Sequence, residues 1–410
     1  MVVTCEISFD NNKFGIFYAG QLVSGCVTLK SDKVKEVQAA LVKVVGYSLT
    51  KWSERRMATT KLYVGREDYI SSQTYLLGSE QTNDRYTIQA GVHNYNFAVQ
   101  LPYQSPSSFE GRYGCVRYIV KVLLIRPWKF DQAYTHGITV LKMMDLNFES
   151  PILKVAAHSE GYRTFCCGPC KTDPLKMEVN LPQAGYVPGQ RIPINVVVIN
   201  NSNMAVSKLD LYLVMLVRYL SVSPEHSRVD RIVISKAKGD SILRRSTRSL
   251  TVELTVPSTP PTCLSLCKLI QIAYQLEVEA SVKSVREQQL ITMPITIGTW
   301  PLGVGSDSRA TPGIVQQPPR RSARYVGEGN ELPLVTSIEN ILTSISPDME
   351  SPRYEESKHT LRGNINEEEL HAFGVNEFAP LYPVYNIDSP IPVISPNSPN
   401  IGYINQSFVK

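Results

Sequence analysis

Three cysteines stand close together near the middle of the 410-residue chain, at Cys166, Cys167 and Cys170. The run from Cys167 to Cys170 reads Cys-Gly-Pro-Cys, the spacing of a thioredoxin-type dithiol. That redox chemistry requires the first cysteine at a helix N-terminus after a buried strand, because the helix dipole lowers its pKa. Here the preceding residues are polar and Pro174 interrupts the sequence that follows. Thiol catalysis is therefore the least favoured interpretation.

The same cysteines are compatible with two other kinds of chemistry. A zinc site would lack a clear fourth ligand unless the fold brought His158, or the pair Cys263 and Cys267, close to them. S-acylation of an exposed connector, which would hold the protein at a membrane, is the other alternative. The sequence favours reduced structural thiols in the connector, and we expect neither a metal ion nor a cofactor.

Other catalytic signatures are missing from the sequence. The six histidines are scattered, and none belongs to an H-E-x-x-H motif. The sequence contains neither a G-x-S-x-G elbow nor a glycine loop of the kind that cradles phosphate. Basic clusters at Arg244-Arg245 and Arg320-Arg321 lack the interleaved aromatic residues of a nucleic-acid platform. We therefore predict a protein that is not an enzyme and does not bind nucleic acid.

The composition changes after Trp300. From Pro301 onward the chain holds 13 of its 27 prolines and periodic apolar runs stop, which predicts a disordered tail over residues 303–410. The tail contains P-x-Y segments, which WW domains bind because the polyproline II form is already ordered. The candidate WW-binding residues are Pro352, Tyr354, Pro380, Tyr382, Pro383 and Tyr385.

Charge is divided unevenly between the tail and the body. The tail from Pro301 holds 8 basic and 13 acidic residues, which leaves 34 basic and 24 acidic residues in the body, a net charge of +10. A basic body favours acidic partners, an anionic membrane surface among them, although an ordinary solubilising surface is the alternative. The N-terminus has no basic segment followed by an apolar run, and no run of about 18 apolar residues occurs. We expect a cytoplasmic protein.

Short apolar strands separated by turn signals fill the body, which predicts β-sandwiches. The segment Val116–Ile125 is apolar on both faces, as is typical of a buried central strand, and Pro127 should end its pairing. Arg117 in this strand would need an anionic partner if it is buried. Gly46, in the long strand Val37–Leu49, marks a bulge or a close approach of another chain segment.

Two landmarks recur in the body. The turn Tyr18-x-Gly-Gln corresponds to Tyr186-x-x-Gly-Gln, and the strand end Leu101-Pro102 corresponds to Val256-Pro257. The separations of 168 and 155 residues differ by an amount that loop lengths can absorb. We interpret this as two copies of one sandwich joined by a connector around residues 162–172. Coincidence is the alternative, because turns often reuse glycine and proline.

Taken together, these segments resemble the α-arrestin family over residues 3–302. The resemblance implies an all-β fold of two tandem immunoglobulin-like β-sandwiches, an arrestin N-terminal domain at 1–165 and an arrestin C-terminal domain at 173–302, followed by the tail. The residues that carry it are Gly46 with Trp52-Ser53-Glu54, Leu101-Pro102 with Pro106-Ser107-Ser108-Phe109-Glu110-Gly111, Gly114 with Arg117-Tyr118, Arg126-Pro127-Trp128, Cys166-Cys167, Gly185-Tyr186 with Pro188-Gly189, Asn200-Asn201-Ser202, and Ile297-Gly298-Thr299 with Pro301-Leu302.

The resemblance also implies a function. An α-arrestin is expected to be a cytoplasmic adaptor, peripheral at the plasma membrane and endosomes, that links receptor or transporter cargo to WW-domain HECT-type ubiquitin ligases for endocytosis and sorting. Those ligases are recruited by P-P-x-Y, whereas Ser351 and Ala379 replace the first proline here. We therefore expect weakened or lost ligase binding. The alternative is an arrestin-fold signalling or cargo scaffold without ligase recruitment.

Overall fold

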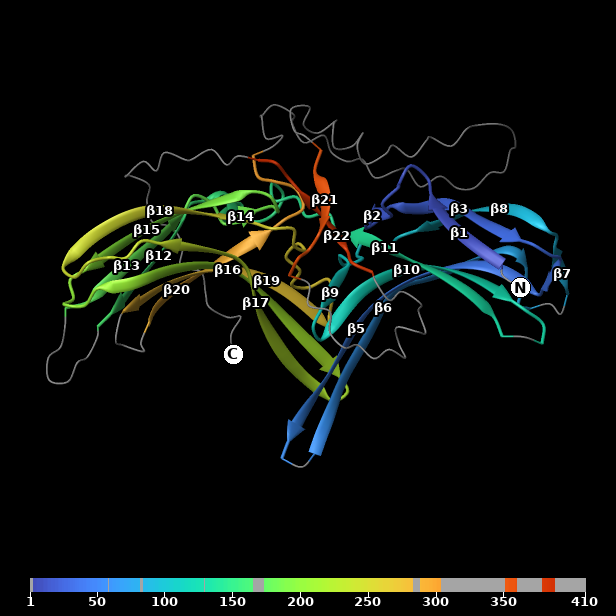
Figure 1. Cartoon of the computed structure of the whole chain (residues 1–410), viewed down its shortest axis with the longest axis horizontal. Coiled ribbons are helices and arrows are strands. Elements are labelled where there is room, and N and C mark those ends of the chain that lie inside the picture. The colour runs from blue at the N-terminus through green and yellow to red at the C-terminus, as the bar shows by residue number, and fades with distance from the viewer. Residues whose placement is uncertain are drawn as a thin grey trace, which may run out of the picture. The chain divides into compact units, whose positions relative to one another are not determined.

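The computed structural model describes residues 3–57, 59–81, 84–128, 130–164, 173–282, 288–303, 351–359 and 378–387. In these ranges every regular element is a β-strand except one short 3-10 helix, η1 (Pro151–Lys154) (Figure 1). None of the helical structure in the described part has the length or apolar character needed to cross a membrane. Described residues up to Leu302 and from Pro352 onward belong to one compact unit.

The first sandwich has two main sheets. One contains, in spatial order, β1 (Val3–Phe9), β3 (Leu22–Ser31) and β8 (Gly91–Gln100). The other contains β2 (Ile16–Tyr18), β11 (Gln132–Leu141), β10 (Gly114–Ile125), β5 (Ala39–Arg56) and β6 (Thr59–Gly78), with β9 (Phe109–Gly111) also paired to β10. Two short strands, β4 (Lys35–Val37) and β7 (Tyr86–Ile88), pair with each other. The short β2 runs parallel to β11.

The second sandwich repeats this arrangement. One sheet contains β12 (Ala157–Arg163), β13 (Leu175–Leu181), β15 (Arg191–Asn200) and β18 (Ser246–Thr255). The other contains β14 (Gly185–Tyr186), β20 (Gln288–Ile297), β19 (Ile270–Val282), β16 (Val206–Val222) and β17 (Glu225–Gly239). The short β14 runs parallel to β20, as β2 does to β11. Apart from β12 in the second sandwich and β4, β7 and β9 in the first, the strand order of the two sandwiches is the same, so the predicted all-β fold of two similar sandwiches is confirmed.

The repeated turn has the same geometry in both sandwiches. Its glycine has a positive φ, +86° at Gly20 and +92° at Gly189, which disfavours any residue with a β-carbon. The next residue, Gln21 or Gln190, accepts a hydrogen bond through its side-chain oxygen from the backbone N–H three residues earlier, at 2.7 and 3.2 Å respectively. The sequence landmark therefore marks equivalent turns after β2 and β14.

The proline-bearing loops that follow Leu101 and Val256 also make equivalent contacts in the two sandwiches. In the first sandwich the hydroxyl of Tyr118, on β10, donates to the carbonyl of Pro106 at 2.8 Å. In the second sandwich Tyr274, on β19, donates to the carbonyl of Pro260 at 2.6 Å. Each proline-bearing loop is thus tied to the buried central strand of its own sandwich.

The predictions for the central strand are confirmed. β10 lies between β5 and β11 and ends at Ile125. Arg117 is buried and forms a bidentate ion pair with buried Glu110, with Nε–Oε1 at 2.5 Å and Nη2–Oε2 at 2.8 Å. At Gly46 the β5–β6 register shifts, and a β-carbon there would come within 2.4 Å of the Tyr118 ring. Gly46 is therefore both a bulge and a point of close approach.

Candidate functional site

Two pieces of the tail form strands, which differs from the expected tail without secondary structure. β21 (Arg353–Glu356) and β22 (Leu381–Val384) pair antiparallel, and this two-stranded sheet joins no other sheet of the described part. Figure 1 shows the pair in orange and red. Long-range side-chain contacts with the body supply order that local composition does not predict.

The first tail contact is with the first sandwich. Tyr382 is only 1% exposed, and its hydroxyl donates to the carbonyl of Ser108 at 3.0 Å. The backbone N–H of Leu381 donates to Thr139 Oγ1 at 3.2 Å. Burial raises the pKa of Tyr382 well above its ordinary value, so the hydroxyl remains protonated and can act as a donor.

The second tail contact is with the second sandwich. Tyr385 is 3% exposed, its hydroxyl donates to the carbonyl of Thr299 at 2.6 Å, and its N–H donates to the carbonyl of Pro188 at 2.9 Å. Its ring meets Trp300 edge-on, with ring centroids 6.4 Å apart. A β-carbon at Gly189 would come within 1.9 Å of the Tyr385 carbonyl oxygen. This position therefore accommodates the tail only as glycine.

β21 also contacts both sandwiches. The hydroxyls of Tyr354 and Tyr18 lie 3.3 Å apart, and Ser258 Oγ donates to the carbonyl of Glu355 at 2.6 Å. The tail is therefore held by Tyr18 at the end of β2, by the turn after β14 and by the proline-bearing loops of both sandwiches. We call these surroundings the tail-docking surface. It comprises Tyr18, Ser108, Gly137, Thr139, Pro188, Gly189, Ser258, Thr299 and Trp300.

A second surface is a projecting hairpin. β10 pairs with β5 only as far as Thr50, and beyond that point β5 pairs with β6 alone (Figure 1). We call residues 51–64 the finger. Met57 is 98% exposed at its turn and Leu62 is 52% exposed, with the exposed basic side chains of Arg55 and Lys61 nearby in sequence. The finger therefore presents apolar and basic groups together.

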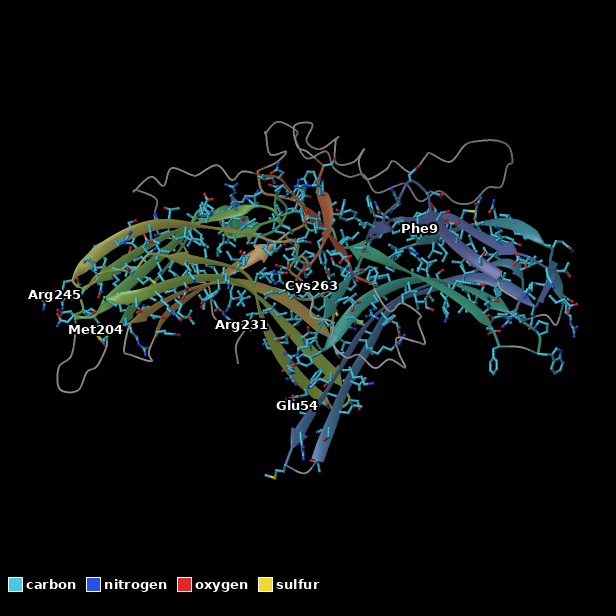
Figure 2. The ribbon with its side chains drawn as sticks, viewed as in Figure 1. Phe9, Glu54, Met204, Arg231, Arg245 and Cys263 are labelled. Atoms are coloured by element: carbon cyan, nitrogen blue, oxygen red, sulfur yellow. The ribbon has the colours of Figure 1, made fainter. Side chains whose placement is uncertain are left out.

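The base of the finger is braced by the second sandwich. Trp52 stacks on Tyr63 with ring centroids 5.4 Å apart, and the Tyr63 ring lies 4.8 Å from that of His226 in β17. Glu54 Oε1, on the finger (Figure 2), lies 3.6 Å from His226 Nε2. These contacts fix the direction in which the finger projects.

The cysteine predictions are only partly covered by the structure. Cys166, Cys167 and Cys170 lie outside the described residues, so their assignment as structural or S-acylated thiols stays a prediction. Cys267 accepts hydrogen bonds from the Tyr69 hydroxyl and a backbone N–H, each at 3.1 Å. His158 Nδ1 lies 2.7 Å from Asn180 Oδ1. Among the described residues, no three His, Cys, Asp or Glu side chains form a group that could hold a metal ion.

The P-x-Y residues are brought together, but in buried positions. Pro352, Pro380 and Pro383 are buried, as are Tyr382 and Tyr385, while Tyr354 is half-buried. The sequence carries a partial signal for this, because the run from Phe378 to Tyr385 is uncharged and holds three aromatic residues, which favours burial over solvation. Charge alone does not distinguish this run, since residues 389–409 are also uncharged.

Comparison with known proteins agrees with this fold. Residues 5–147 match the family model "Arrestin (or S-antigen), N-terminal domain", and residues 171–302 match "Arrestin (or S-antigen), C-terminal domain". Together the two matches cover more than half of the chain.

Several curated relatives are similar over most of their length. The chain is 28% identical to arrestin domain-containing protein 17 of Caenorhabditis elegans, over 93% of this chain and 98% of the relative, so the match extends beyond the sandwiches into the tail. It is 26% identical to human arrestin domain-containing protein 4, over 74% and 73% of the two chains. It is 25% identical to rat thioredoxin-interacting protein, over 72% and 73%. The chain is an arrestin-type adaptor or scaffold, and it belongs to the α-arrestin family.

Proposed function

We propose that this chain is an adaptor in membrane-protein trafficking. It binds the cytosolic parts of receptors or transporters and works in the cytoplasm, peripheral at the plasma membrane and endosomes. It acts without catalysis of its own. The observation that carries the proposal is the braced finger, whose tip exposes Met57 almost completely.

The chemistry of the finger suits such cargo. Its tip offers Met57 and Leu62 as exposed apolar contact groups for a partner, with the basic side chains of Arg55 and Lys61 nearby in sequence. The net charge of +10 on residues before Pro301 favours acidic cytosolic segments and an anionic membrane surface. Because rings from both sandwiches pack at its base, the finger is presented in one direction, which lowers the ordering cost of binding.

Ligase recruitment is the second part of the proposal. A WW domain must reach the proline and tyrosine rings of its ligand. Here the rings of Pro380, Tyr382 and Pro383 are buried while the tail is docked. The geometry therefore favours an adaptor or scaffold that recruits no ligase until the tail leaves its surface.

Cross-linking in intact cells tests cargo binding. We expect membrane receptors or transporters to be cross-linked to the wild-type chain and to be lost with Met57→Glu/Leu62→Glu. Val92→Glu, at a residue that is 58% exposed on β8, is the matched control and should retain them. An unchanged set of partners with the finger variant would contradict the proposal.

A WW-domain pulldown tests the ligase part separately. Free peptides containing Tyr354 or Tyr382 should capture more WW protein than the same amount of full-length chain. Replacing either tyrosine with alanine in its peptide should abolish capture. Equal capture by wild-type and substituted peptides would remove ligase recruitment and leave the scaffold function.

A further inference from the structure

We propose that the tail-docking surface is a binding site for extended, unphosphorylated peptides of the form Tyr-Pro-x-Tyr, and that β22 is its built-in ligand. An external segment of this chemistry, contributed by a partner protein, would bind in place of β22. The inference is independent of the proposed cargo and ligase roles, because it names only the chemistry of the ligand.

Besides the backbone N–H groups of Leu381 and Tyr385, which donate to Thr139 Oγ1 and to the Pro188 carbonyl, the side chains of residues 381–385 hold the segment on the body. Within the described residues β22 pairs only with β21, so no body sheet holds its backbone in a ladder. The hydroxyl of Tyr382 reaches Ser108 in the first sandwich, and that of Tyr385 reaches Thr299 beyond the end of β20. Two tyrosines at a spacing of three therefore span both sandwiches, and this spacing defines the ligand.

The surface leaves room for the peptide at two glycines. A β-carbon at Gly189 would meet the Tyr385 carbonyl oxygen at 1.9 Å, and one at Gly137 would meet the Phe378 ring at 2.6 Å. Glycine allows such close approach because it has no side chain. The two positions lie on different sandwiches, so both halves of the surface are shaped to the segment.

The hydroxyl groups give the site its specificity. Ser108 and Thr299 are buried, and their carbonyls accept the two tyrosine hydroxyls at 3.0 and 2.6 Å. A peptide with phenylalanine at these positions would bury the carbonyls without those donors, which such sites reject strongly. A phosphate would place its negative charge against the same carbonyl oxygens in a buried place. The ligand must therefore carry unmodified tyrosines.

The built-in ligand competes with external peptides. A tethered segment has an effective concentration on the order of 1 mM, which weakens an external peptide of about 100 µM affinity roughly tenfold. Displacing the tail by mutation should restore that affinity. The pairing edge of β21 (Arg353–Glu356) would then accept the external peptide by strand addition.

Fluorescence anisotropy with a labelled peptide of residues 378–387 tests the proposal. The full-length Tyr382→Ala/Tyr385→Ala chain should bind this peptide about tenfold more tightly than the wild-type chain does. Tyr382→Phe/Tyr385→Phe is the second variant, because it removes both donors and keeps both rings. Peptides with two phenylalanines or two phosphotyrosines should bind roughly thirtyfold more weakly than the parent peptide, or weaker still.

Two further changes make the test specific to the surface. In the double-alanine chain, Gly189→Ala should abolish binding, whereas Gly20→Ala, in the equivalent turn of the first sandwich, should leave it intact. Equal affinity of the wild-type and double-alanine chains, equal binding of the phenylalanine peptide, or indifference to Gly189→Ala would each overturn the proposal. A dimer of the wild-type chain that the double-alanine variant abolishes would overturn the external ligand in favour of the tail of a second copy.

Discussion

Substituting Gly189 with alanine should release the tail, while the same substitution at Gly20 should not. The two glycines occupy equivalent turns and have similar positive φ angles, +92° and +86°. Backbone strain from a β-carbon should therefore cost each variant a similar amount, about 1–3 kcal/mol. Any difference between the variants then reports on the tail.

The expected difference in tail docking between the two variants follows from the atoms that each new β-carbon would meet. At Gly189 the new β-carbon would lie 1.9 Å from the Tyr385 carbonyl oxygen, whereas real β-carbons stay beyond 3.0 Å from such atoms. A shift of about 1 Å would break the two hydrogen bonds of Tyr385, which together contribute about 2 kcal/mol, or roughly thirtyfold in the docking equilibrium. At Gly20 the β-carbon would meet the ring of Tyr103, which is 74% exposed and can turn away.

Amide hydrogen exchange of residues 378–387, followed by mass spectrometry, measures this directly. Exchange should be slow in the wild type and in Gly20→Ala, and roughly thirtyfold faster in Gly189→Ala. The melting temperatures of both variants measure the backbone strain that the two substitutions have in common. Unchanged protection in Gly189→Ala, or equal loss in both variants, would refute the reasoning.

The other predictions concern the first sandwich. Glu110→Leu should cost about 3–5 kcal/mol in urea unfolding because it leaves Arg117 buried without its partner, and Glu110→Leu/Arg117→Leu should cost less; equal losses would contradict this. Gly46→Ala should cost about 1–3 kcal/mol and lower the melting temperature by pressing on Tyr118. Burial raises the pKa of Tyr47 from 10.0 to about 12, so stability should hold below pH 10 and fall towards pH 12. Tyr47→Phe should make that fall shallower.

Much of the sandwich architecture could be predicted from sequence because it depends on local patterns. The two apolar faces of Val116–Ile125 identify a central strand, and the structure places β10 between two neighbours. Arg117 in that strand predicts a buried anionic partner, which is Glu110. Gly46 predicts a bulge, and the register shifts there.

The tail could not be predicted in the same way. The bonds that order it join residues far apart in sequence, since Tyr382 reaches Ser108 across 274 positions and Tyr385 reaches Thr299 across 86. The composition of a segment reflects only local preferences, so it gives no sign of partners this far away in the sequence. The many prolines of the tail also predict a chain without strand pairing. Pro383 is nevertheless tolerated in β22, because that strand lies at the edge of a two-stranded sheet.

The finger was likewise not predictable as a whole. The long strand that the sequence predicts, Val37–Leu49, ends before the finger, and Trp52-Ser53-Glu54 enters only through the family resemblance, so neither indicates the bracing by β17. The Tyr63 ring contacts His226, which is contributed by the other sandwich. Contacts between domains carry no periodicity that a single sequence reveals.

Disulfide trapping offers the most direct test of the docked tail. The N–H of Leu381 lies 3.2 Å from Thr139 Oγ1, so the two residues are in contact when the tail is docked, and a disulfide between cysteines placed there would report that contact. Mild oxidation of full-length Thr139→Cys/Leu381→Cys should give an intramolecular 139–381 disulfide by peptide mapping, and adding Gly189→Ala should slow its formation. If the thiol introduced by Leu381→Cys forms disulfides only between molecules, or shows no preference for position 139, the tail is not docked between the sandwiches.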